Sequence, residues 1–365
     1  MPSPSMSTPR PIRVLVVGLG TMGTSHARAY QAIDGFELAG LCTSRAAARH
    51  DLAAEFHGLP RFERYDEALA TVRPDAVAIC TTTEHHAAMA LQAFEAGAHV
   101  FCEKPLADTL EAARAVVNAA RASGKALLVG YILRVHPSWS RFVEIGRTLG
   151  KPLVMRMNLN QQSAGAFWEV HKKLMLSTSP IVDCGVHYVD IMCQVTRARP
   201  VMIHAVGARL TDEIAPDMYN YGHLHIVFED GSVGWYEVGW GPMMSVTAHF
   251  VKDIIGPNGS VSMVAKESID ATAGSADHDT HTRTNALRIH HAVRNSKGGF
   301  ARSDEILSTE DEPGHQELCE REQRLFLQAI RGEIDLSEHH EAAINSLGIV
   351  FAADASVRSG EIVRL

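Results

Sequence analysis

A glycine-rich turn between an apolar run and a helical segment is the strongest constraint on how this 365-residue chain folds. Gly18, Gly20 and Gly23 form a G-x-G-x-x-G pattern that follows the β-branched run 12–17 and opens a helix predicted over 21–32. The first glycine permits a tight bend, the second lets a pyrophosphate approach the backbone, and the third lets helix and strand pack closely. The helix N-terminus adds N–H donors and partial positive charge. We therefore predict a dinucleotide-binding βαβ unit, with cofactor contacts from Gly18, Gly20, Thr21, Met22 and Gly23.

The first third of the chain alternates strand-like and helix-like segments, which predicts a parallel sheet covered by helices. Short apolar runs are separated there by stretches of helix length, as in right-handed βαβ units. The predicted strands are 12–17, 36–43, 75–80, 99–102 and 126–131. The predicted helices are 21–32, 46–56, 86–96 and 106–122.

The pattern changes after Tyr131, where longer strands follow one another with few helices between them. Runs of adjacent strands predict a mostly antiparallel sheet, and Glu229-Asp230-Gly231 is a hairpin signal. Residues 266–313 are polar without clear periodicity, so we expect loops there. The predicted strands are 153–159, 201–210, 221–228 and 232–238, and the predicted helices are 137–147, 181–195, 316–331 and 338–358.

These patterns define an α/β protein of two domains, which 365 residues accommodate. We predict an N-terminal Rossmann domain over 12–132, and over 133–365 an α+β domain with a large, mostly antiparallel, open-faced sheet. Residues 1–11 are rich in Pro and Ser and have no apolar core. They are interpreted as a disordered lead and not as a secretory signal.

The amino-acid composition excludes several kinds of binding partner for this chain. With 34 Lys and Arg against 42 Asp and Glu the net charge is −8, which argues against nucleic acid or a polybasic membrane anchor. No apolar run reaches the length of a membrane helix, about 18 residues. None of the six cysteines forms a C-x-x-C pair, so we expect reduced thiols and a cytoplasmic location. The 20 histidines include the pair His223 and His225 and a group at 278–291, but no recognised ligand spacing, so no functional metal is expected.

The residues after the second predicted strand bear on the type of dinucleotide. NAD-binding proteins tend to place a carboxylate there, about 20 residues beyond the glycines, to bind the ribose 2′-hydroxyl. This chain has Ser44, Arg45 and Arg49 instead, and a hydroxyl with guanidinium groups suits a 2′-phosphate. We favour NADP(H) over NAD(H), and keep open that both arginines lie on a solvated helix face with NAD bound.

Two further motifs carry a family resemblance. Cys102-Glu103-Lys104-Pro105 ends a predicted strand, and Asp183-Cys184-Gly185-Val186-His187-Tyr188-Val189-Asp190 has the form D-x-G-x-H-x-x-D. Both resemble the Gfo/Idh/MocA family, the group of glucose–fructose oxidoreductase and inositol 2-dehydrogenase. The segments 130–137 and 353–365 are similar too, so the resemblance covers nearly the whole chain. It implies an NAD(P)-dependent oxidoreductase that transfers a hydride between nicotinamide and a secondary alcohol or ketone of a sugar, sugar derivative or cyclitol.

The motif residues suit this chemistry. Oxidising an alcohol releases a proton as well as a hydride, and a group of near-neutral pKa is the best base for that proton. Asp183 and His187 are four residues apart, so on a helix they share one face. By resemblance, His187 is the acid/base, Asp183 orients the substrate hydroxyl, and Lys104 shares the proton transfer and stabilises oxyanion charge. The resemblance also implies that Glu103 packs near the nicotinamide or holds Lys104, and that the Lys104–Pro105 bond is cis.

Weaker candidates flank these residues. Thr81, Thr82 and His86 occupy a segment that lines the nicotinamide ribose in the family, with Thr82 in place of the usual proline. The family often has a glycine run before Asp183, whereas this chain has Ser177-Thr178-Ser179-Pro180, which reshapes that wall. The candidate substrate contacts are Lys104, Tyr131, Arg134, Trp168, His171, Asp183 and His187.

Three other functions stay open on these observations: a nicotinamide-retaining glycosidase, a non-enzymatic sugar or dinucleotide sensor, and a reductase similar to trans-dihydrodiol dehydrogenases. The presence of Lys104 and His187 argues against the sensor. We expect a homodimer or homotetramer that forms through an exposed sheet face of the second domain, with Tyr221, Trp235 and Trp240 on that face.

Overall fold

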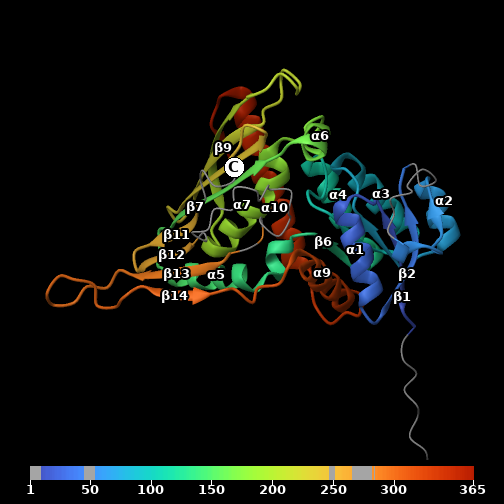
Figure 1. The fold of residues 1–365 in the computed structure, drawn as a ribbon, viewed down its shortest axis with the longest axis horizontal. Coiled ribbons are helices and arrows are strands. Elements are labelled where there is room, and N and C mark those ends of the chain that lie inside the picture. The colour runs from blue at the N-terminus through green and yellow to red at the C-terminus, as the bar shows by residue number, and fades with distance from the viewer. Residues whose placement is uncertain (1–9, 45–53, 246–250, 265–281, 283) are drawn as a thin grey trace, which may run out of the picture. The chain divides into compact units, whose positions relative to one another are not determined.

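The computed structural model describes residues 10–44, 54–245, 251–264, 282 and 284–365. They fold into two compact units (Figure 1). The first unit runs to Gly130 and includes Gln316–His340, and the second comprises Tyr131–His315 and Glu341–Leu365. The predicted division differs in one respect, because 316–340 belongs to the first unit and not to a continuous second domain. The predicted lead 1–11 lies outside the described residues, apart from its last two. Across the described ranges, no helix is long and apolar enough to cross a membrane.

A six-stranded sheet forms the centre of the first unit, and all of its strand pairs are parallel. The order β3-β2-β1-β4-β5-β6 places β1 beside β4, so the loops at their carboxyl ends are neighbours. This confirms the parallel sheet predicted from the alternation. The strands are β1 (Ile12–Val17), β2 (Phe36–Cys42), β3 (Arg61–Phe62), β4 (Ala76–Ile79), β5 (His99–Cys102) and β6 (Leu127–Val129).

The predicted helices of the first unit that lie in the described residues are present, but some begin at a different residue. α4 begins at Leu110 and not at 106, because the Thr109 side chain accepts a hydrogen bond from the Ala112 N–H and caps the helix there. The predicted helix 46–56 lies outside the described residues except for a short 3-10 turn, and α2 and β3 were not predicted. The elements are α1 (Thr21–Ala32), η2 (Ala54–Phe56), α2 (Tyr65–Val72), α3 (Thr83–Glu95), α4 (Leu110–Ser123) and α9 (His315–Ile330).

Helix α9 belongs with the first unit because its apolar side enters that unit's core. Phe326 is fully buried there, and its ring stacks on Phe36 at a centroid distance of 6.4 Å. Leu327 is buried in the same cluster. Burial of this apolar surface explains why a segment so late in the chain folds with the N-terminal sheet.

The second unit is built on a nine-stranded sheet of order β14-β13-β12-β11-β7-β10-β9-β8-β15. The β7–β10 pair is parallel and the other pairs are antiparallel, which confirms the mostly antiparallel sheet. The expectation of loops over 266–313 is wrong for the edge strand β14 and its inner neighbour β13, because polar side chains in both strands hid their period. The strands are β7 (Val154–Gln162), β8 (Pro200–Ala208), β9 (Tyr221–Phe228), β10 (Val233–Gly241), β11 (Lys252–Gly256), β12 (Gly259–Met263), β13 (Ala286–His291), β14 (Glu305–Ser308) and β15 (Val363–Arg364).

One face of this sheet carries helices. α7 packs on β7, β9 and β10, and Gly185 lets it approach closely, since a Cβ there would lie 3.3 Å from the Tyr236 ring. The helical elements are η3 (Ile132–Val135), α5 (Pro137–Thr148), α6 (Gly165–Leu174), α7 (Pro180–Thr196) and α10 (Ser337–Ser359), whose first turn belongs to the first unit. α6 was not predicted.

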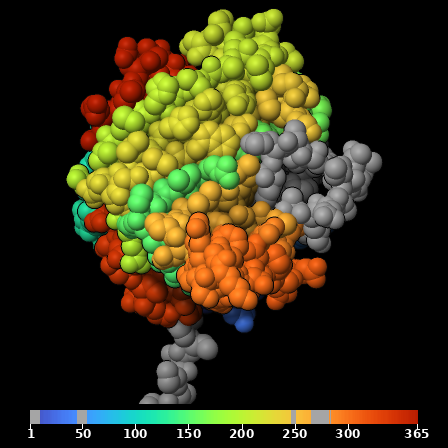
Figure 2. All heavy atoms as spheres, turned by 90° about the vertical axis from the view of Figure 1, so that its left-hand side faces the viewer, coloured from blue at the N-terminus to red at the C-terminus, as the bar shows by residue number. Residues whose placement is uncertain are grey.

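The opposite face is open, and Figure 2 shows its strands side by side, from β9 and β10 in yellow through β7 in green to β13 and β14 in orange. Tyr221 and Trp235 lie partly exposed on the strands of this sheet, as predicted. Trp240 does not: it is buried and stacks on His171 at 4.4 Å. Trp235 and Trp240 are five residues apart on β10, so the alternation of a strand sends them to opposite faces.

A buried lysine lies on the helix-covered side of the sheet. Lys252 is 4% exposed, donates from Nζ to the Asn158 carbonyl at 3.0 Å, and lies 5.7 Å from the Tyr188 ring. Burial lowers the pKa of Lys252 to about 7. Since the unfolded chain binds this proton up to the ordinary lysine pKa of 10.5 and the folded chain releases it near 7, stability rises with pH across that window.

We predict that Lys252→Met raises the unfolding free energy at neutral pH by about 2 kcal/mol or more, because it removes the cost of burying an amine. Denaturant unfolding at neutral and alkaline pH measures this, and the variant's stability should rise less with pH than the wild type's. Lys297→Met, at an exposed position, is the control. An unchanged or lower stability of Lys252→Met would contradict this account.

Candidate functional site

The glycines after β1 have three different local surroundings. Gly18 has φ +86°, and a Cβ there would lie 2.4 Å from the Cys80 carbonyl oxygen. A Cβ on Gly23 would lie 1.8 Å from the Gly18 carbonyl oxygen. A Cβ on Gly20 would meet nothing within 4 Å. Gly18 and Gly23 are therefore required by the fold of the loop itself, whereas Gly20 keeps open the space beside the backbone.

The N-terminus of α1 is arranged to receive an anion. Gly20 is its N-cap, so no side chain caps the helix, and the first turn carries no acidic residue. Thr21 and Met22 are the first two helical residues. Their backbone N–H groups, at the positive end of the helix dipole, fit the pyrophosphate of a dinucleotide.

The residues predicted to select the dinucleotide are described only in part. Ser44 is exposed two residues beyond β2. Arg45 and Arg49 lie outside the described residues.

The end of β4 is tied to the Lys104 segment through His86. This buried side chain lies with Nδ1 2.7 Å from the Pro105 carbonyl oxygen and Nε2 3.1 Å from the Thr81 carbonyl oxygen. Burial lowers the pKa of His86, and carbonyl oxygens only accept, so the shorter contact favours the proton on Nδ1. His86 thus braces two loops, while Thr81 and Thr82 stand at the entrance to α3, where Thr82 is the N-cap.

Glu103 and Lys104 follow β5. Glu103 is 6% exposed; its Oε1 lies 2.9 Å from His26 Nε2, and its Oε2 accepts from the Lys104 backbone N–H at 3.2 Å. Gly130 leaves room for this carboxyl group, since a Cβ there would lie 3.2 Å from Oε2. Lys104 is partly exposed, and the Lys104–Pro105 bond is cis, as the resemblance implied. His26 was missed in the sequence, although it stands one helical turn into α1.

In the second unit, Asp183 and His187 occupy successive turns of α7 and are both partly exposed. The segment that replaces the family's glycine run begins this helix. Ser179 is its N-cap, accepting from the Val182 N–H at 3.3 Å, and Pro180 is its first residue. The spacing thus gives the predicted shared face.

Tyr131 and Arg134 lie beside this helix. The rings of His187 and Tyr131 are nearly perpendicular at a centroid distance of 5.9 Å, and the Tyr131 hydroxyl lies 2.7 Å from Ser346 Oγ. Arg134 holds Asp190 with two hydrogen bonds, of 2.8 and 2.6 Å. Asp190, the last residue of the motif, therefore anchors α7, and this engagement makes Arg134 a structural partner of the helix.

Trp168 and His171 lie on α6 and are both buried. Trp168 Nε1 donates to Glu213 at 3.2 Å. His171 stacks on Trp240, and its Nδ1 lies 2.9 Å from Ser163 Oγ. Both side chains are thus committed to packing within the second unit.

Two of the histidines considered as metal ligands lie beside carboxylates. His290 lies 2.8 Å from Asp304, and His291 lies 2.8 Å from Glu305. The rings of His223 and His225 are 5.6 Å apart on β9. His278, Asp279 and His281 lie outside the described residues. All six cysteines are described, and none forms a disulfide.

Comparisons with known proteins identify the family. Residues 12–131 match the model described as "Oxidoreductase family, NAD-binding Rossmann fold", and residues 146–261 match the GFO/IDH/MocA C-terminal domain. The chain belongs to the Gfo/Idh/MocA family, and its first unit is an NAD(P)-binding Rossmann domain.

Individual proteins resemble the chain in sequence or in structure. UDP-N-acetylglucosamine 3-dehydrogenase of Acidithiobacillus ferrooxidans is 34% identical over 203 residues, which are 55% of this chain and 60% of that protein. The chain thus spans less than two thirds of that relative. The scyllo-inositol 2-dehydrogenase (NAD(+)) of Bacillus subtilis is 26% identical over 97% of this chain and 96% of its own. The structure of the WlbA dehydrogenase from Bordetella pertussis, in complex with NADH and UDP-GlcNAcA, has a TM-score of 0.74 at 20% identity, covering 98% of this chain and 99% of that one.

We predict that two glycine substitutions separate folding from dinucleotide binding. Gly20→Ala keeps the thermal midpoint of the unliganded protein, because the methyl group meets open space, but weakens NAD(P) binding at least about tenfold. Gly23→Ala lowers the midpoint itself, because the Gly18 carbonyl must move.

Thermal unfolding and calorimetric titration with NAD⁺ and NADP⁺ measure both effects. If Gly20→Ala bound the dinucleotide as tightly as the wild type, the cofactor could not occupy the open space beside Gly20, and this prediction would be wrong.

Proposed function

We propose that the protein is an NAD(P)-dependent oxidoreductase that transfers a hydride between nicotinamide and a secondary alcohol or ketone of a sugar, sugar derivative or cyclitol. The observation that carries the proposal is the pair of proton-transfer groups at motif positions, Lys104 after β5 and His187 on α7. The dinucleotide fits the first unit because the α1 N-terminus is uncapped and Gly20 leaves its approach open.

The roles of the side chains follow from their chemistry. A bound nicotinamide supplies the hydride acceptor for oxidation or the donor for reduction. His187 takes the hydroxyl proton from the alcohol and returns it in the reverse direction. Asp183, one helical turn earlier, accepts a hydrogen bond from a neighbouring hydroxyl of the substrate and so orients the hydroxyl that reacts. The Lys104 ammonium donates to the reacting oxygen and stabilises the charge that develops on it.

The rigidity of these groups supports the assignment. His187 is held against Tyr131, and α7 is fixed by the Arg134–Asp190 pair. The Lys104 backbone is held by Glu103, and the next residue by His86. Groups fixed by packing lose little entropy when a substrate aligns with them.

The proposal also includes which dinucleotide the protein prefers and where in the cell it is located. We propose NADP(H), because no carboxylate follows β2 and Ser44 precedes two arginines. The WlbA dehydrogenase holds NADH, so the assay below includes both dinucleotides. Six cysteines without a disulfide are in keeping with the cytoplasm.

We predict that Lys104→Ala lowers kcat/KM for nicotinamide reduction by about 100-fold or more, because it removes a proton-transfer and oxyanion-stabilising group. His187→Asn should lose a similar factor. The measurement is absorbance of reduced nicotinamide with a panel of inositols, hexoses, sugar acids, UDP-N-acetylglucosamine and aryl diols, each with NAD⁺ and NADP⁺.

Lys125→Ala, a partly exposed lysine after α4, is the control and keeps full activity. Undiminished turnover by Lys104→Ala would refute the role of Lys104. Cleavage of aryl glycosides without net nicotinamide reduction would replace the proposal by the glycosidase.

We also propose that the protein is a homodimer or homotetramer formed through the open face of the second unit's sheet. Val233, Val154 and Ile255 are aligned across β10, β7 and β11, and each is close to 40% exposed. An exposed apolar row across three adjacent strands is costly in water, and this cost is relieved when a second copy covers the row.

We predict that Val154→Asp shifts the protein to monomers at micromolar concentration in light scattering, because a carboxylate cannot be buried there without a partner. Val170→Asp, on α6 and 52% exposed against 40% for Val154, is the control and leaves the mass unchanged. A monomeric wild type, or an unaltered Val154→Asp oligomer, would count against this assembly.

A further inference from the structure

A chain of buried polar side chains lies behind the Lys104 segment, and the proposed reaction does not use most of it. The Tyr30 hydroxyl donates to Gln323 Oε1 at 2.6 Å, and Gln323 Nε2 lies 2.9 Å from His26 Nδ1. His26 Nε2 lies 2.9 Å from Glu103 Oε1, and Glu103 Oε2 accepts from the Lys104 N–H. Tyr30, His26 and Gln323 are fully buried. The chain therefore links α1, α9 and the end of β5 inside the first unit.

The direction of these hydrogen bonds is set at the Tyr30 end. Burial raises the pKa of Tyr30 well above 10, so its phenol stays protonated and donates to the Gln323 carbonyl. The Gln323 amide then turns its N–H toward His26 Nδ1, and this nitrogen must be unprotonated in order to accept the hydrogen bond. His26 consequently carries its proton on Nε2 and donates to Glu103. Glu103 accepts at both oxygens, as a carboxylate does.

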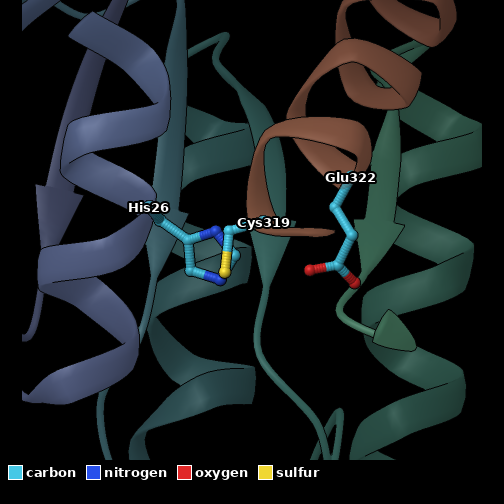
Figure 3. A group of neighbouring side chains, drawn as sticks. All are labelled: His26, Cys319 and Glu322. Carbon is cyan, nitrogen blue, oxygen red and sulfur yellow. The ribbon is translucent and has the colours of Figure 1, made fainter. Parts of the chain in front are cut away.

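A second carboxyl group lies in the same region. Glu322 is 2% exposed, and its Oε2 has no hydrogen-bond partner among the described residues. Figure 3 shows the Glu322 carboxyl group beside His26 and Cys319. Burial, and then the charge of Glu103, raise the pKa of Glu322 well above 4.5. Glu103 lies 2.9 Å from His26 Nε2, and an oxygen of Glu322 lies within 4.8 Å of a His26 ring nitrogen, so both carboxyl groups approach the same ring. Two carboxylates placed in this way in a dry interior repel, so one of them holds a proton.

A metal ion is the alternative occupant of this cluster. One ligand atom each from His26, Cys319 and Glu322 lies within 4.8 Å of the others, and these are residue types that bind zinc. The hydrogen bonds favour a proton, because Nε2 of His26 carries its own hydrogen and Nδ1 receives one from Gln323. Burial also raises the pKa of the Cys319 thiol, which disfavours the thiolate.

We propose that Glu322 is the protonated member of a buried carboxyl pair, and that with Gln323 and His26 it keeps Glu103 ionised behind Lys104. These three are positioning residues: they act on Lys104 through Glu103. Support for the carboxyl pair comes from the first unit alone. Its proposed effect on catalysis also depends on the function proposed for Lys104.

The thiols and the phenol that face the pair do not supply a second negative charge at neutral pH. Burial raises the pKa of the three thiols and of Tyr30, and lowers the pKa of His86, so all stay neutral. Glu103 is then the negative charge next to Lys104, where it favours the ammonium form. The facing groups, taken from every surrounding element, are His26, Tyr30, Cys80, His86, Cys102, Cys319 and Lys104.

The first experiment detects the proton directly and needs no substrate. The infrared spectrum of the wild type at neutral pH should contain the C=O stretch of a protonated carboxyl group, shifted in D₂O. Glu322→Gln should lose this band, and Glu320→Gln, a more exposed glutamate on the same helix, should keep it. A wild type without the band, a band retained in Glu322→Gln, or one equivalent of tightly bound Zn²⁺ or Co²⁺ after addition of the metal alone overturns the pair.

The second experiment tests the link to Lys104. His26→Leu removes the hydrogen-bond donor to Glu103, so Glu103 becomes easier to protonate and its charge no longer favours the ammonium form of Lys104. We expect kcat/KM to fall about tenfold, and the midpoint of its pH dependence to move to lower pH. His26→Gln keeps an N–H donor and should restore most of both. A loss of rate without a shift of the midpoint means a merely structural role and overturns the positioning claim.

The two proposals fail in different ways. Absence of Lys104-dependent turnover in the wild type defeats the proposed function while the infrared band still supports the carboxyl pair. Turnover that depends on Lys104, without the band, defeats the carboxyl pair alone.

Discussion

The burial of one carboxylate, Glu103, is the constraint on which the site in the first unit depends. A buried charge is tolerated only when hydrogen bonds replace water, and Glu103 receives them from His26 and from the Lys104 backbone. Gly130 is small because the carboxyl group needs its space. The same requirement explains why α9 folds with the first unit, since Gln323 orients His26 while Phe326 fills the core.

In the second unit, Asp183 and His187 lie on a helix that is held to its surroundings at several points. The stack of Tyr188 on Tyr236, at 4.8 Å, fixes α7 to the sheet, and Arg134 fixes Asp190. Ser179 and Pro180 fix where the helix begins. Helices cover one face of the sheet, and the other face is open.

Local patterns were sufficient to predict the parallel sheet, the mostly antiparallel sheet and the loop at Gly18–Gly23, because each rests on short-range chemistry. The motif residues Lys104, Asp183 and His187 were found by resemblance. The Gln323–His26 contact was not predictable, since it joins positions 297 residues apart. β13 and β14 were missed because their polar residues obscure the apolar pattern of a strand. The odd spacing of Trp235 and Trp240, in contrast, already placed the two rings on opposite faces of the sheet.

Transfer of deuterium from substrate carbon to the dinucleotide tests the central claim most directly. Carbon-deuterated inositols and hexoses would be incubated with the enzyme and NAD⁺ or NADP⁺, and the reduced dinucleotide analysed by mass spectrometry. The account predicts one deuterium in the nicotinamide ring for each ketone formed. Product formation with an unlabelled dinucleotide, or with solvent hydrogen at the reacting carbon and no net reduction, would contradict it.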